Sequence, residues 1–272
     1  MAEVDATWLH VRREHALAVW TLDGPGSRNA LYGEPLFAAF EAEVLAANRD
    51  GGLRAVILTG VDPAFCSGGN TREMIQRSGM FAGPAHAICE QYRTGIQRIA
   101  RALDRLEVPL IAAVNGVAIG AGCDLACMCD LRIASERASF AESFVKVGIV
   151  PGDGGAWLLP RVVGYARAAE MAFTGASVGA EQAKAIGLVS EVVEHGALMK
   201  RSLELAGTIA ANSPRAVRWT KRLLKRAADG RLDDALEFAA AYQALAHHSP
   251  EHSESLRAMR ERRPPRFDEI TR

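Results

Sequence analysis

The sequence predicts an α/β fold on two observations. In the first two thirds of the chain, short apolar segments that read as buried strands alternate with segments whose apolar residues have helical spacing. Beyond Pro151, strand patterns become rare, and the last third is mainly helical. We therefore expect an α/β core over residues 1–195. Residues 196–272 should form a helical C-terminal region that packs on this core or on a neighbouring subunit.

The composition indicates a globular protein with a large core, since 49% of the 272 residues are hydrophobic and 24% are charged. Basic and acidic residues both number 32, so no positive excess favours nucleic acid or an anionic membrane as a partner. The longest apolar run, residues 109–123, is shorter than the roughly 20 residues that a spanning helix needs. The polar N-terminus and an odd number of cysteines, five, favour a cytoplasmic location.

Individual elements can be predicted from residue spacing. Residues 8–22 predict two strands around a charged turn at residues 12–14. Apolar residues recur at helical spacing over residues 36–45, and Gly51 follows as a possible C-cap. The same spacing predicts a second long helix over residues 88–106. Buried strands are expected at residues 54–60, 109–114 and 131–135.

Two segments share one local pattern, in which a strand leads through a glycine cluster into a helix. They are residues 55–74 and 110–128. Asn70 can cap the first helix and Glu73 can return a hydrogen bond, whereas the second helix should begin near residues 121–123. Either turn alone is explained by a tight βα connection that needs glycine. Two such turns, each with unpaired N–H groups, could instead converge on one oxygen atom, as thioester enolate chemistry requires.

Two other interpretations of residues 116–130 are weaker. The glycines of residues 120–122 follow a strand, but position 125 is leucine, so the glycine fingerprint of a dinucleotide site is incomplete. The cysteines at this site lie too close together for two zinc knuckles, and no histidine stands nearby in the sequence. We therefore expect these cysteines, at positions 123, 127 and 129, to be packing residues and not metal ligands.

Six motifs follow one another along the chain. They are RNAL (28–31), AVILTG (55–60), AFCSGGNTREM (64–74), IAAVNGVAIGAGCDLACMCDLRIA (111–134), VGIVPGDGGAWLLPRVVG (147–164) and AKAIGLVSEVV (183–193). In this order they resemble the crotonase superfamily, the enoyl-CoA hydratases, isomerases and their relatives. The resemblance covers about residues 8–267 and implies a spiral of ββα repeats with a C-terminal helical trimerisation region. It also implies an acyl-CoA substrate, no metal or nicotinamide cofactor, and a homotrimer or a dimer of trimers.

The resemblance also implies roles for particular residues. The thioester carbonyl would lie between the backbone amides of Gly69 and Ala121, which would form an oxyanion hole. Asn70 would lie in the substrate pocket. The basic segment at residues 260–267 either approaches the CoA phosphates or is a solvated helix end. The CoA path would be lined by Arg28, Ala30 and Ser67.

The acid–base residues depart from the hydratase pattern. Hydratases of this superfamily hold one water between two glutamates, and the matching positions here are Asp124 and Phe144. Because phenylalanine cannot transfer protons, Glu142 or Asp153 would have to replace the second glutamate. Each acid also has a simpler explanation. Asp124 could be a first-turn acid of a helix, Glu142 a surface or interface residue, and Asp153 a turn residue.

We therefore expect an acyl-CoA enzyme that stabilises an enolate, with Asp124 and Asp153 as catalytic carboxylates. Phe144 and Glu142 would line the substrate pocket, and an apolar wall including Phe144 would raise the pKa of a nearby aspartate. With two competent carboxylates the enzyme would be an enoyl-CoA hydratase. With one, it would be a double-bond isomerase. The remaining alternative is a non-catalytic acyl-CoA binder, because the second glutamate is missing.

Overall fold

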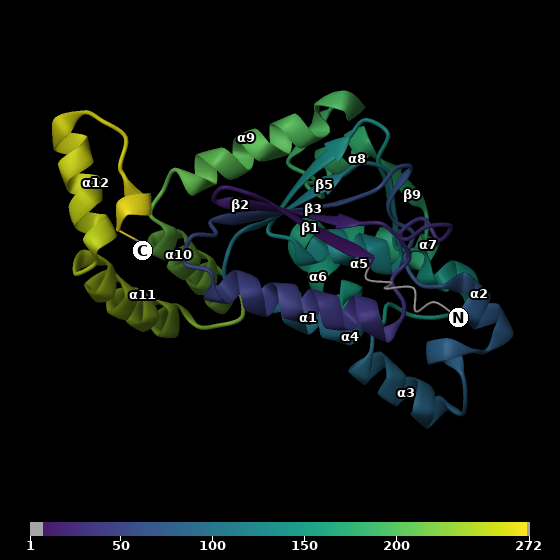
Figure 1. The fold of residues 1–272 in the computed structure, drawn as a ribbon. Helices are drawn as coiled ribbons and strands as arrows, with labels where there is room; N and C mark the ends of the chain where they lie inside the picture. Colours follow the sequence, from purple (N-terminus) through teal and green to yellow (C-terminus); the bar gives the residue numbers. More distant parts are fainter. Residues whose placement is uncertain (1–7, 271–272) are drawn as a thin grey trace, which may run out of the picture.

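Two sheets run through the core of the protein (Figure 1), and from the third strand to the eighth, successive strands alternate between them. The structure is a computed structural model that describes residues 8–270. The start of the polar N-terminus therefore lies outside the described residues. The larger sheet contains, in spatial order, β1 (Leu9–Glu14), β2 (Leu17–Leu22), β3 (Ala55–Gly60), β5 (Leu110–Val114), β7 (Leu131–Ser135) and β10 (Glu191–Val193). The smaller contains β4 (Ala64–Cys66), β6 (Val117–Ile119), β8 (Ser139–Ala141) and β9 (Ser177–Gly179).

The chain winds as a spiral because each turn gives one strand to each sheet and then enters a helix. Strands β2, β3, β5 and β7 pair in parallel in the larger sheet, as do β4, β6 and β8 in the smaller. This is the α/β spiral that the resemblance implies, and the fold prediction is confirmed. The helical segments that follow the strand pairs are α2 (Thr71–Gln76), α5 (Ala121–Met128), η2 (Ser143–Val147) and α6 (Gly155–Val163).

The central strands are buried on both faces, as parallel strands covered by helices usually are. All residues of β3 are buried, and they alternate between two apolar clusters because strand side chains point to opposite faces in turn. Val56 and Leu58 belong to the cluster that includes α1 (Glu34–Arg49) and α4 (Gln97–Asp104). Ile57 packs on the other face, which α9 (Leu198–Ala210) covers (Figure 1).

Every regular element described between residues 195 and 270 is helical. Helices α11 (Leu232–His247) and α12 (Pro250–Glu261) extend away from the sheets, and α11 has no buried residue (Figure 1). None of the helices in the described part of the chain combines the length and apolar character of a membrane span. The remaining helices and 3-10 turns are η1 (Gly79–Phe81), α3 (Ala85–Thr94), α7 (Tyr165–Thr174), α8 (Ala180–Ala185), η3 (His195–Ala197), α10 (Pro214–Ala227) and η4 (Phe267–Glu269).

Two details of the predicted elements are wrong. The first strand continues to Glu14, so the turn falls after it, at His15, which adopts a left-handed φ of 53°. The helix expected over residues 88–106 is two helices, α3 and α4, because the chain leaves the helical conformation at Gly95 (φ −109°, ψ −114°). A Cβ at Gly95 would lie 3.3 Å from the ring of Phe37, so the break brings the backbone close to α1.

Candidate active site

The two glycine turns lie side by side because the strands that lead into them, β4 and β6, pair in parallel. At Gly122 a Cβ would lie 2.1 Å from the carbonyl oxygen of Cys66, so only glycine fits. Gly68 has a φ of 90°, and a Cβ there would lie 2.4 Å from the carbonyl oxygen of Ile119 and 3.4 Å from the amide nitrogen of Ala121. Each turn therefore packs directly against the other.

The amides expected to bind an oxyanion flank this contact. Ala121 is the first residue of α5, so its N–H has no acceptor within the helix. Gly69 immediately precedes Asn70, the N-cap of α2. The side-chain oxygen of Asn70 accepts the N–H of Glu73 at 3.4 Å, and its amide donates to the Glu73 carboxylate at 3.1 Å, so the capping prediction is confirmed. The end of Met74 lies beside Gly69, 2.9 Å from where a Cβ would be.

Arg28, Ala30 and Ser67, the residues expected along the CoA path, lie on two loops that hydrogen bonds join. The amide of Ser67 donates to the carbonyl of Arg28 at 3.0 Å, and the amide of Leu31 donates to the carbonyl of Gly68 at 2.7 Å. Ala30 is buried, whereas Arg28 is exposed. The structure thus brings these three residues together beside the first glycine turn.

The three acids singled out in the sequence come together in the interior from three different elements. Asp124 lies on the first turn of α5, Glu142 directly follows β8, and Asp153 lies in the loop before α6. They are 0%, 1% and 4% exposed, respectively. Asp124 Oδ2 accepts the N–H of Gly155 at 3.0 Å. Asp124 Oδ1, both Glu142 oxygens and Asp153 Oδ1 have no hydrogen-bond partner among residues 8–270.

Gly155 occupies the point where Asp124 and Glu142 meet. A Cβ at Gly155 would lie 2.1 Å from Asp124 Oδ1 and 2.4 Å from Glu142 Oε1. The two carboxyl oxygens therefore face each other across the space that a side chain would fill. The interpretation of Glu142 as a surface residue is wrong, since Glu142 is buried against Asp124.

Burial is the largest cause of a raised pKa at all three acids. The pKa of Asp124 lies well above its ordinary value, and the nearby Glu142 and Asp153 raise it further. The pKa of Glu142 is raised to about 8 and that of Asp153 to about 6. At neutral pH the cluster therefore retains at least one proton, and Asp153 is the member that ionises most readily.

Two aromatic rings lie beside the elements that carry the acids. Phe144 is 8% exposed, and its ring lies 3.6 Å from where a Cβ of Gly120 would be, beside the N-terminus of α5. Tyr92 packs on Gly152, and both burial and the charge of Asp153 raise the pKa of its hydroxyl group. Tyr92 could not be predicted as a site residue, because its helical spacing is the one signal that it carries in the sequence.

Buried cysteines complete the surroundings of the acids. Burial raises the pKa of the Cys66 thiol to about 12, so this thiol is neutral. The cysteines at positions 123, 127 and 129 are buried too, as expected of packing residues. Within residues 8–270, no group of three or more His, Cys, Asp or Glu side chains is placed to hold a metal ion.

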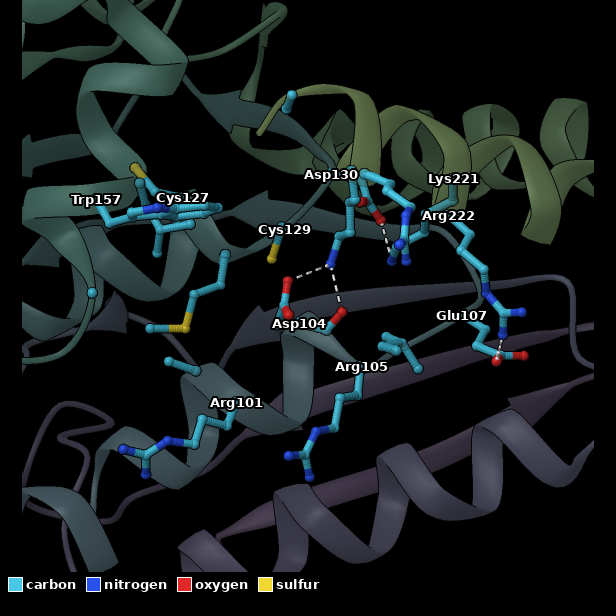
Figure 2. A pocket seen from close by; sticks show the side chains of 18 of the residues that line it. Arg101, Asp104, Arg105, Glu107, Cys127, Cys129, Asp130, Trp157, Lys221 and Arg222 are labelled. Atoms are coloured by element: carbon cyan, nitrogen blue, oxygen red, sulfur yellow. Dashed lines mark hydrogen bonds and ion pairs between the residues drawn. The ribbon is translucent and has the colours of Figure 1, made fainter. Parts of the chain in front are cut away.

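A cavity of about 1010 Å³ lies between α4, α5, α6 and α10 (Figure 2). Cys127 and Gly154 line it, but none of the three acids does. Its rim carries ion pairs, including Lys221 with Asp130 at 2.6 Å (Figure 2). The three acids are therefore almost completely buried and do not lie in this cavity.

The α/β spiral thus brings two helix N-termini, with their free N–H donors, beside buried acids of raised pKa, which are the groups that acid–base catalysis uses. The sequence model of the family described as enoyl-CoA hydratase/isomerase matches residues 12–270. The chain belongs to this family, and the resemblance to the crotonase superfamily is confirmed.

Relatives and solved structures match over nearly the whole chain. The short-chain-enoyl-CoA hydratase of Clostridium acetobutylicum is 37% identical over 231 residues, which are 84% of this chain and 85% of the relative. The 1,2-epoxyphenylacetyl-CoA isomerase of Escherichia coli is 33% identical over 254 residues, 93% and 95% of the two chains. The crystal structure of an enoyl-CoA hydratase from Bacillus anthracis has a TM-score of 0.88 at 30% identity and covers 95% of this chain and 98% of its own.

Proposed function

We propose that this enzyme adds water to the double bond of a 2-enoyl-CoA thioester. The observation that carries the proposal is the burial of Asp124 and Asp153 in one cluster with unequal affinities for protons. Two acids whose pKa values are pushed apart can divide the roles of acid and base. Relatives named as short-chain-enoyl-CoA hydratase and crotonyl-CoA hydratase support the substrate class.

In the proposed reaction Asp153 accepts a proton from water while the water oxygen bonds to C3 of the acyl group. The electron pair of the double bond moves to the thioester oxygen, whose negative charge accepts hydrogen bonds from the amides of Gly69 and Ala121. Asp124 then donates its proton to C2, and the carbonyl re-forms. Asp153 finishes protonated and Asp124 ionised, so one proton must pass back before the next turnover. The proposal needs no metal or nicotinamide cofactor.

Phe144 favours a second candidate, double-bond isomerisation. Its ring stands at the position that the family resemblance assigns to the second hydratase glutamate, and it cannot hold a water molecule. An ionised Asp124 would remove a proton from C2 of a 3-enoyl-CoA and return it to C4, which moves the double bond to C2–C3. The relative from Escherichia coli that is named 1,2-epoxyphenylacetyl-CoA isomerase supports isomerisation of a CoA thioester in general, although its named substrate is an epoxide.

A panel of thioesters tests both candidates. The purified enzyme is incubated with 2-enoyl-CoA and, separately, with 3-enoyl-CoA. The absorbance of the conjugated enoyl group and the product mass are followed. Hydration removes that absorbance and adds the mass of one water, whereas isomerisation of the 3-enoyl-CoA creates the absorbance at constant mass. Asp153→Asn should abolish hydration but spare isomerisation. If neither thioester is turned over, both proposals fail and a non-catalytic binder is left.

We also propose that CoA runs past Arg28, Ala30 and Ser67, with Asn70 beside the acyl group. Arg28 is exposed and belongs to the loop that hydrogen bonds hold beside Gly69. Its guanidinium group can reach a phosphate from there. Arg28→Ala should therefore raise KM for the thioester with little change in kcat. An unchanged KM would argue against this path.

We propose a homotrimer or a dimer of trimers, assembled through the C-terminal helices, in the cytoplasm. Three leucines of α11, Leu232, Leu236 and Leu245, are 74%, 57% and 57% exposed, and such apolar surface favours contact with another subunit. The free cysteines support a reducing compartment. Light scattering after size exclusion should give three or six times 29.2 kDa, and Leu236→Lys should lower that mass.

A further inference from the structure

Glu142 has no part in the proposed reaction, yet it is buried more completely than most acids of the chain. It is 1% exposed, and neither carboxyl oxygen has a hydrogen-bond partner among residues 8–270. Burying an ionised carboxylate without a partner is strongly unfavourable. Glu254, also buried, shows the usual solution, since its carboxylate pairs with Arg263 at 2.6 Å. Glu142 therefore needs a proton or a donor.

Asp124 offers the complementary group. Its Oδ2 is fixed by the N–H of Gly155, which leaves Oδ1 without a partner among the described residues. This Oδ1 faces Glu142 Oε1 across the space beside the Gly155 Cα. A single proton between the two oxygens would give both of them a hydrogen bond, and no other described group supplies one.

We propose that Asp124 and Glu142 share one proton, and that Glu142 is a positioning residue that holds Asp124 in its acid form. The carboxyl hydroxyl of Asp124 donates to Glu142, and Oδ2 of Asp124 remains an acceptor for Gly155. Glu142 thereby sets both the orientation and the protonation of the acid without touching the substrate.

The groups around the pair favour one retained proton. Asp153 adds negative charge from the loop before α6. Burial raises the pKa of the Cys66 thiol from β4, and the hydrogen bond with Cys127 together with burial raises that of the Cys123 thiol from α5, so both thiols are neutral. Cys127, also on α5, lies near Glu142 as well. A second negative charge on the pair would therefore lie in an apolar, partly anionic environment. In such a pair the two acids lose their protons in separate steps.

The consequence for catalysis rests on the proposed function. When Asp124 gives its proton to C2, Asp124 and Glu142 become two ionised groups facing each other. Asp153 is protonated at that point, because it has taken a proton from water. Transfer of this proton from Asp153 to Asp124 relieves the repulsion and restores the starting state. Glu142 thus drives the return of the proton.

Infrared spectroscopy of the unliganded enzyme tests the pair without any substrate. At pH 8 the C=O stretch of a buried, protonated carboxyl group should be present in the wild type and largely lost from Glu142→Gln, because the glutamine amide can donate to an ionised Asp124. Glu254→Gln is the matched control, because Arg263 is the main cause that lowers the pKa of Glu254 to about 2. This variant should keep the band. A band that persists unchanged in Glu142→Gln, or is missing from the wild type, overturns the proposal.

The pH dependence of kcat/KM provides a second readout. Glu142→Gln should move the alkaline limb of the profile down by at least one pH unit, which is about a tenfold loss at pH 8 with near wild-type turnover at pH 6. A uniform loss at every pH would indicate a merely structural role and contradict the proposal. If the wild type turns over no thioester, the proposed function fails, but the infrared band still decides whether the pair exists.

Discussion

The two glycine turns follow the same local pattern, yet they are anchored in different ways. The turn between β6 and α5 leads into a buried helix, since every residue of α5 from Ala121 to Cys127 is buried. In the turn between β4 and α2, the helix has no buried residue and is held by the Asn70 cap. Gly122 has backbone against it, whereas Gly69 has the end of the flexible Met74. One amide of the proposed oxyanion hole is therefore fixed by packing, and the other by hydrogen bonds at the surface.

This difference explains where the acids lie. A carboxyl group shifts its pKa strongly only where solvent is excluded, and only the second turn provides such an interior. The first turn is packed at Gly68, against the Ile119 carbonyl, but from Gly69 into α2 it can adjust to a ligand because α2 has no buried residue. We call the turn before α5 the rigid turn and the turn before α2 the adjustable turn.

The largest effect is expected at the acid of the rigid turn. Asp124→Asn keeps the shape of the side chain but removes its transferable proton, so kcat/KM should fall by about 10²- to 10⁴-fold. Turnover of the enoyl-CoA panel measures this loss. Asp104→Asn is the control, since that side chain is 70% exposed and pairs with Lys225 at the surface. Unchanged turnover in Asp124→Asn would contradict a catalytic role for Asp124.

A methyl group added to each turn compares their rigidity directly. Gly122→Ala pushes a Cβ against the Cys66 backbone and should lower the free energy of unfolding by about 3 kcal/mol or more. Gly69→Ala meets only the end of Met74, which can move, and should cost less than about 1 kcal/mol. Urea denaturation of both variants gives the two values. Similar losses would show that the turns are equally rigid.

The pH dependence of stability reports on the acids behind the rigid turn. Their pKa values are higher in the folded state, so the folded protein binds more protons and the free energy of unfolding falls as pH rises. Asp153 alone, raised from 3.8 to about 6, should contribute a loss of roughly 2–3 kcal/mol between pH 4 and pH 7. Urea denaturation of the wild type and of Asp153→Asn measures it. The variant should show a flatter dependence, and an identical slope would contradict the assignment.

The smallest effect is expected at the cap of the adjustable turn. Asn70→Ala removes the acceptor for the Glu73 amide and should destabilise α2 by about 1 kcal/mol. Since α2 buries no residue, the global unfolding midpoint should hardly change. Hydrogen exchange at the amides of residues 72–74 should accelerate several-fold. A large shift of the global midpoint would instead show that the turn before α2 stabilises the core as much as the turn before α5 does.

The fold and half of the site could be predicted from the sequence because their signals are local or follow from the family resemblance. The glycine turns and the Asn70 cap depend on short spacings, and Asp124 stands at a matching motif position. The break at Gly95 was not predicted, since the apolar spacing continues through it and a single glycine is tolerated within a helix. The burial of Glu142 depends on α5, β8 and α6 meeting in space, for which the sequence carries no local signal.

Gly155 carries neither a charge nor a side-chain hydrogen-bonding group, yet it controls the distance between the two acids that its missing Cβ would touch. Its backbone N–H anchors one of them, and its lack of a side chain admits the other. A single methyl group at this position would push the two carboxyl groups apart and remove the hydrogen bond that we propose between them. The number of protons that the two acids hold would therefore depend on the missing side chain of Gly155. A mutational survey confined to ionisable side chains would overlook it.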